Sequence, residues 1–132
     1  GESRTDPRVL RLFRAGRAIP VCPEQLGGLP TPREPAEIVG GDGQDVLDGR
    51  ARVIDKMGRD VTASFVKGAE QVLFLARQAG AKRAILKRKS PSCGVRSYDR
   101  SEANRTPPSI SPEGVTAALL RRAGIRVYGS PT

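Results

Sequence analysis

One pattern occurs three times in this chain: a helix-like segment, the pair Ala-Gly, and then a short apolar segment. The Ala-Gly pairs occupy residues 15–16, 79–80 and 123–124. The strands that we expect after them cover residues 18–21, 84–86 and 125–128. Glycine just beyond the last helical turn adopts the left-handed conformation that reverses the chain. This alternation is typical of a parallel sheet with crossover helices.

Each expected helix also has a start signal. Helices are predicted to begin at Asp6-Pro7, near Asp60 or Thr62, and near Ser111-Pro112, where a capping side chain or an N1 proline is present. The sequence therefore predicts a single α/β domain over residues 1–132, with a Rossmann-like parallel sheet and crossover helices. A doubly wound sheet normally opens on a strand, so we expect its first strand to be missing here.

Two segments interrupt the alternation. Residues 23–49, approximately, are rich in glycine and proline, and residues 97–112 are polar. We expect a long loop over the first segment and a flexible surface loop over the second. Long loops are usually functional or disordered, and a functional role is favoured for the first.

Charge narrows the classes of ligand. The net charge is +9, and aromatic residues make up only 4% of the chain. Such a field attracts anions. The arginines are dispersed and stacking aromatics are scarce, which favours an anionic small molecule over RNA, although RNA remains the second choice.

The expected cellular compartment follows from features that the sequence lacks. No apolar run approaches the ~18 residues that a membrane span needs, and the polar start is no secretory signal. A chain with two cysteines is no secreted disulfide scaffold, so we expect a cytoplasmic protein.

The two cysteines both follow expected strands. Cys22 comes directly after Val21, and Cys93 lies in the turn KSPSCG beyond the strand 84–86. In a parallel sheet both would lie at the carboxyl edge, where such sheets bind ligands, so we expect them to lie close together. Two unrelated free thiols are an equally good interpretation of the spacing alone. Zinc usually takes four ligands, and the chain has no histidine to complete such a site.

The chain resembles the thiouracil desulfidase family, long catalogued as a domain of unknown function, over essentially its whole length. The matching motifs are VCPEQLGGLPTPR at 21–33, GGDG at 40–43, GRDVT at 58–62, SPSCG at 90–94 and GVTAALL at 114–120. The resemblance implies hydrolytic, non-redox removal of sulfur from 4-thiouracil or 4-thiouridine monophosphate, with release of hydrosulfide. It also implies a 4Fe-4S cluster held by three cysteines, of which two match Cys22 and Cys93. We expect the third upstream of Gly1.

The implied reaction needs an acid or base near the substrate. Glu24, two residues after Cys22, is the first candidate, and Ser90 is the second, as a proton relay. Ser92 is a candidate for substrate binding, and Arg33 for contact with a phosphate or carboxylate. Each has an ordinary structural alternative: a loop carboxylate for Glu24, turn capping for the serines, and an ion pair for Arg33.

Other functions stay open at this point. A desulfidase acting on thiolated tRNA fits the positive charge, and so does a non-catalytic RNA-binding or metal-sensing module. The two cysteine motifs argue against the module, because recognition by charge needs neither. The glycines at 27–28 and 40–43 permit close backbone approach or positive φ, but no P-loop is formed because Gly-Lys-Ser/Thr does not follow.

Overall fold

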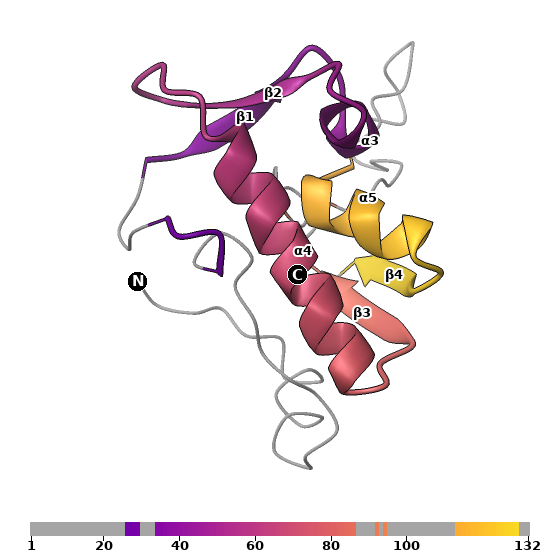
Figure 1. Ribbon diagram of the computed structural model, residues 1–132. Coiled ribbons are helices and arrows are strands. Elements are labelled where there is room, and N and C mark those ends of the chain that lie inside the picture. The colour runs from indigo at the N-terminus through magenta and orange to yellow at the C-terminus, as the bar shows by residue number, and fades with distance from the viewer. Residues whose placement is uncertain (1–25, 30–33, 87–91, 93, 95–112, 130–132) are drawn as a thin grey trace, which may run out of the picture.

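The computed structural model describes residues 26–29, 34–86, 92, 94 and 113–129, which form an α/β arrangement (Figure 1). The expected helix from Asp6, the expected strand 18–21 and the loop 97–112 lie outside these residues. The elements are β1 (Ala36–Val39), α3 (Gly43–Leu47), β2 (Arg52–Asp55), α4 (Thr62–Gln78), β3 (Arg83–Leu86), α5 (Val115–Arg122) and β4 (Arg126–Gly129).

The alternation of helix and strand is confirmed for the second and third repeats. β3 and β4 pair in parallel, in a register that runs from Arg83 opposite Arg126 to Leu86 opposite Gly129. Gly80 and Gly124 follow their helices with φ of +67° and +84°. The amide after each glycine donates to a carbonyl five residues back, at 2.8 Å after α4 and 3.0 Å after α5. This is the glycine-dependent helix end that turns each chain segment back into its strand.

A second, antiparallel sheet departs from the prediction. β1 pairs with β2 from Ala36 opposite Asp55 to Val39 opposite Arg52. The loop expected over residues 23–49 is therefore corrected: it contains a strand at 36–39 and a short helix at 43–47. Strands of four residues show too little periodicity to stand out among the glycines and prolines. Within the described residues, the parallel sheet consists of β3 and β4 and a fully Rossmann-like sheet is not established.

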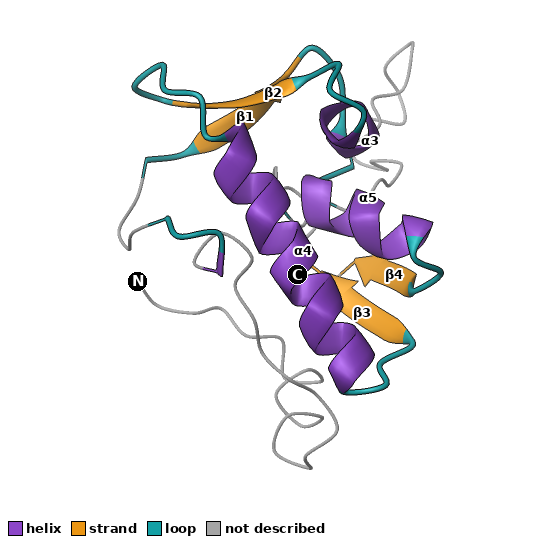
Figure 2. Cartoon of the chain, viewed as in Figure 1, coloured by secondary structure: helices purple, strands orange, loops and turns teal. Residues whose placement is uncertain are grey.

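The long helix α4 connects the two sheets (Figure 2). Its first half packs in a cluster beneath β1 and β2, and its second half packs in a cluster beneath β3 and β4. The buried members of the first cluster are Val46, Ala51, Val53, Phe65, Ala69 and Val115. Those of the second are Val72, Leu86, Ala117, Leu120 and Ile125. None of the helices in the described part of the chain is long and apolar enough to cross a membrane.

Thr62 ties the start of α4 to β2. The backbone amide of Val53 donates to Thr62 Oγ1 at 2.8 Å, and the amide of Thr62 donates to Asp60 Oδ1 at 2.9 Å. The Thr62 side chain is also the main reason that the pKa of Asp60 falls to about 2, with the backbone amide of Thr62 and the side chain of Arg52 adding to the effect. One buried hydroxyl thus satisfies a strand amide and stabilises a carboxylate before the helix.

We predict that Thr62→Val destabilises the fold by about 1–3 kcal/mol, because it leaves the buried Val53 amide without its acceptor. Urea denaturation measures the change. Thr62→Ser, which keeps the hydroxyl, is the matched control and should lose less. A loss in Thr62→Val no larger than that in Thr62→Ser would contradict the prediction that the hydrogen bond dominates.

Candidate functional site

The residues on either side of Cys93 in the sequence are fixed against the start of α5. The amide of Thr116 donates to the carbonyl of Ser92 at 2.7 Å, and the amide of Gly114 donates to the carbonyl of Gly94 at 2.7 Å. The Ser92 and Thr116 hydroxyls lie 3.2 Å apart, and both side chains are buried. α5 runs back towards β4, so its start lies near the carboxyl ends of β3 and β4. The backbone beside Cys93 is therefore tied to that edge.

Gly114 makes this close packing possible. A side chain on it would place Cβ 2.5 Å from the Ser92 carbonyl oxygen and 2.6 Å from the Gly94 amide. Both distances are shorter than any real Cβ contact, and the atoms that would clash belong to the backbone, which cannot swing away. Only glycine lets the segment around Ser92 and Gly94 lie directly on the beginning of α5.

A third segment meets the same place. The amide of Gly43, the first residue of α3, donates to the Glu113 carbonyl at 2.6 Å, and a side chain on Gly43 would collide with the Gly114 carbonyl. α3 is held there by a capping box: Asp45 N donates to Asp42 Oδ1 and Asp42 N donates to Asp45 Oδ2. The amide of Asp42 is the main influence that lowers the pKa of the Asp45 carboxyl. We call this meeting of residues 42–43, 92, 94 and 113–116 the glycine junction.

Glu113 brings a buried carboxylate to the glycine junction. Its Oε2 accepts from Gln44 Nε2 at 3.3 Å, and its Oε1 lies 3.0 Å from Arg121 Nε. The Arg121 contact is an ion pair without hydrogen-bond alignment, so Oε1 is buried with no hydrogen-bond donor. Arg122 supports the same packing, because its guanidinium donates to Gln44 Oε1 at 2.6 Å and to Asp48 Oδ1 at 2.9 Å. Arg122 therefore links α5 to α3 directly, while Arg121 pairs with Glu113, whose other oxygen accepts from Gln44 of α3.

The segment that follows the Cys22 motif also packs by backbone contact. Gly27 lies so close to the carbonyl of Ser64 in α4 that a Cβ would collide with it, and Gly28 has φ of +89°. Leu26 and Leu29 pack against the second and the first core cluster. The expectation of close approach or positive φ at these glycines is confirmed. It also holds at Gly40, whose φ is +96°.

The sequence-predicted site residues divide into two groups. Ser92 is described: it is buried, and its hydroxyl contacts Thr116, so a role in binding substrate stays a prediction. The others lie outside the described residues: Cys22, Glu24, Arg33, Ser90 and Cys93. The expected proximity of the two cysteines is therefore still a prediction.

Sequence reasoning assigned no role to Glu113, Gly114 or Thr116. The signal was present at Gly114, where a glycine stands directly before an apolar helix in place of the usual Ser, Thr or Asp. Glu113 gave no such signal, since a glutamate before a helix is normally exposed, and its burial follows only from the packing of α3.

The cysteine thiols of the chain are the type of ligand that an iron–sulfur cluster needs. The described residues contain no group of three or more His, Cys, Asp or Glu that could hold a metal. The thiols of the chain are those of its two cysteines, and thiolate is the ligand that such clusters use. A cluster held by three cysteines would need one thiolate more than the printed sequence contains.

Comparisons with known proteins give a consistent result. A family model described as 2-thiouracil desulfurase matches residues 2–130. The chain is 43% identical over 128 residues to the uncharacterized protein YbbK of Bacillus subtilis (strain 168), covering 96% of this chain and 83% of YbbK. It is also similar to a solved structure, the [4Fe-4S]-dependent thiouracil desulfidase TudS, at 41% identity and a TM-score of 0.73, with 96% of this chain and 76% of that one covered.

We predict that Gly114→Ala destabilises the chain by about 1–3 kcal/mol, because the new methyl displaces the backbone beside Cys93. In a chain that also carries the expected third cysteine, it should lower the iron bound after anaerobic reconstitution. Gly58→Ala is the matched control. Gly58 has φ of +82° but open space around it, so it should cost about 1–2 kcal/mol of backbone strain and leave bound iron unchanged. If the two variants bound the same amount of iron, the packing at the glycine junction would not be needed for metal binding.

Proposed function

Since the chain belongs to the 2-thiouracil desulfurase family, we propose that it removes sulfur from a thiopyrimidine by hydrolysis, through residues at the carboxyl edge of the β3–β4 sheet. The observation that carries this proposal is the anchoring of Ser92 and Gly94, which flank Cys93, on the first turn of α5. That anchoring lets one thiol be presented from a fixed backbone. A reactive centre must be held in this way if its geometry is to be productive.

The proposed reaction is balanced without an oxidant or a reductant. The oxygen of water bonds to the thiocarbonyl carbon of the pyrimidine, the carbon–sulfur bond breaks, and sulfur leaves as hydrosulfide. Water supplies the oxygen of the new carbonyl, and its protons pass to the departing sulfur and to solvent. No net electron transfer occurs, so the step is hydrolytic.

In this proposal, residues of the chain transfer the protons and orient the substrate. Glu24 accepts a proton from the attacking water, and Ser90 relays a proton to or from the substrate. Ser92 supports the turn and contacts substrate through its position beside Cys93, while Arg33 binds a phosphate when the substrate is a nucleotide. These four roles rest on the motifs in which the residues stand.

Cys22 and Cys93 are the residues that would hold a 4Fe-4S cluster. When bound, such a cluster would supply a soft Lewis acid for the substrate sulfur. TudS is named as a [4Fe-4S]-dependent enzyme, which supports the same cofactor here.

The position of the sulfur on the ring is part of the proposal. The resemblance implied a 4-thiopyrimidine, as the free base or the nucleoside monophosphate, whereas the description of the matching family names 2-thiouracil. Assays with both 2-thiouracil and 4-thiouracil, followed by loss of thiocarbonyl absorbance, distinguish the two. Turnover of 2-thiouracil alone would exclude the 4-thio assignment.

We predict that Glu24→Gln, in a chain that also carries the expected third cysteine, keeps the cluster but lowers sulfide release from 4-thiouracil by about 10²–10⁴-fold, the usual loss when a general acid or base is removed. Substrate absorbance is followed anaerobically after reconstitution, and iron is determined in the same sample. Glu37→Gln is the matched control, because Glu37 is an exposed carboxylate on β1 and should retain full activity.

Two results would contradict the role of Glu24. Near-normal turnover in Glu24→Gln would remove it from the mechanism and favour Ser90. Loss of iron in Glu24→Gln, with normal iron in Glu37→Gln, would make Glu24 a residue that supports the cluster and not one that transfers protons.

A further inference from the structure

The cations of the described residues are of two kinds. Five arginines form ion pairs with carboxylates: Arg50, Arg52, Arg59, Arg121 and Arg122. Six others have no ion pair with any described carboxylate, and four of these six line one hollow: Arg77, Lys82, Arg83 and Arg126. The remaining two, Lys56 and Lys67, are exposed elsewhere. Most of the described cations that have no ion pair are therefore gathered at one place.

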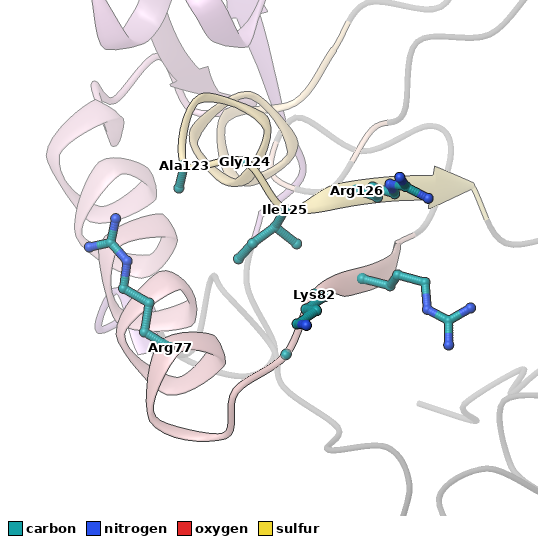
Figure 3. A pocket seen from close by; sticks show the side chains of 8 residues that line it. Arg77, Lys82, Ala123, Gly124, Ile125 and Arg126 are labelled. Atoms are coloured by element: carbon teal, nitrogen blue, oxygen red, sulfur yellow. The ribbon is translucent and has the colours of Figure 1, made fainter.

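The hollow lies at the amino edge of the parallel sheet. Its volume is about 620 Å³, and it is bordered by the end of α4, the starts of β3 and β4, and the turn after α5. Ile125, which is buried, forms part of its wall. In Figure 3, Arg77 lies on one side of Ile125, on α4, while Arg126 lies on the other side, on β4. The cations are thus spread along the hollow and do not converge on a single point.

Helix dipoles do not account for this charge. α4 and α5 both end beside the hollow, and a basic residue in the last turn of a helix is favourable there. That explains Arg77 alone, because Lys82, Arg83 and Arg126 follow the helices and belong to turns or strands. In each helix, three carbonyls of the last turn moreover accept from backbone amides: those of residues 75–77 in α4 and of residues 119–121 in α5.

An exposed sheet face continues from the hollow. Arg83 stands opposite Arg126, and two residues further along the strands Ile85 stands opposite Tyr128. Residues two apart in a strand share a face, so all four lie on one face. Ile85 and Tyr128 are 44% and 47% exposed. Charge and an aromatic surface therefore lie next to each other within a few residues.

We propose that the hollow and this face bind a single-stranded RNA chain, with the cations on successive phosphates and Tyr128 against a base. A charged groove beside an aromatic platform is the usual arrangement for single-strand binding. The spread of the cations suits an extended chain of phosphates better than one phosphate group. The hollow lies at the edge opposite to the glycine junction, and RNA binding does not depend on the proposed reaction.

The test is binding of a fluorescent 12-nucleotide oligouridylate to the whole chain, measured by anisotropy from 50 to 200 mM salt. We expect Arg83→Gln/Arg126→Gln to weaken binding at least tenfold at the lowest salt. Loss of two phosphate contacts should also flatten the slope of log K against log salt by about 1.4. Tyr128→Leu should weaken binding about fivefold or more, with an unchanged salt slope.

The matched control is Lys56→Gln/Lys67→Gln. It removes the same charge from exposed positions that are not part of the hollow. We expect its affinity within about twofold of the unmodified chain. If Arg83→Gln/Arg126→Gln fails to fold by circular dichroism, Arg77→Gln/Lys82→Gln, at exposed positions on a helix end and a turn, replaces it with the same expected loss.

Several outcomes would overturn the proposal. They are no binding of oligouridylate by the unmodified chain, equal losses in the arginine and lysine variants, and competition by uridine monophosphate at the same nucleotide concentration. Equal losses in the arginine and lysine variants would indicate that binding depends only on total charge. Competition by uridine monophosphate would indicate a site for a small nucleotide.

Discussion

The backbone contact between Gly114 and the Ser92–Gly94 segment determines how the rest of the site is placed. A turn that follows β3 is fixed to the start of α5 by main-chain hydrogen bonds, without intervening side chains. Gly43 brings α3 to the same point, so segments far apart in the sequence share one junction. Contacts of this kind are stiff, because backbone atoms have no rotamers through which to relax. A site that depends on them loses its geometry when one glycine gains a methyl group.

The contact between α3 and α5 and the amino end of the parallel sheet differ in charge pairing. Where α3 packs against α5, Arg122 pairs with Asp48 after α3, and Arg121 pairs with Glu113 before α5. At the amino end, the cations around the hollow have no carboxylate partner among the described residues. Pairing removes charge where segments must pack closely, and unpaired charge remains where the surface faces solvent. Positive charge is therefore not spread evenly over the described part of the fold.

The sequence predicted the strongly periodic elements well. α4 and α5 have long apolar faces and glycine stops, so their ends and the strands after them could be placed within a few residues. β1, β2 and α3 could not be placed, because each has only four or five residues and depends on pairing with distant segments. At the site, the close approach of Gly27 was foreseen from its motif. The burial of Glu113 was not, since it arises from α3, an element that the sequence did not reveal.

The core clusters share their helices, and this links the two sheets thermodynamically. α4 contributes Phe65 and Ala69 to one cluster and Val72 to the other, while α5 contributes Val115 to the first and Leu120 to the second. Neither cluster can open without exposing apolar groups of the other, so the antiparallel pair is not an independent lobe. Amide hydrogens in the middle of α4 should then exchange with solvent only through global opening. The described elements act as one cooperative unit, although their strands belong to two separate sheets.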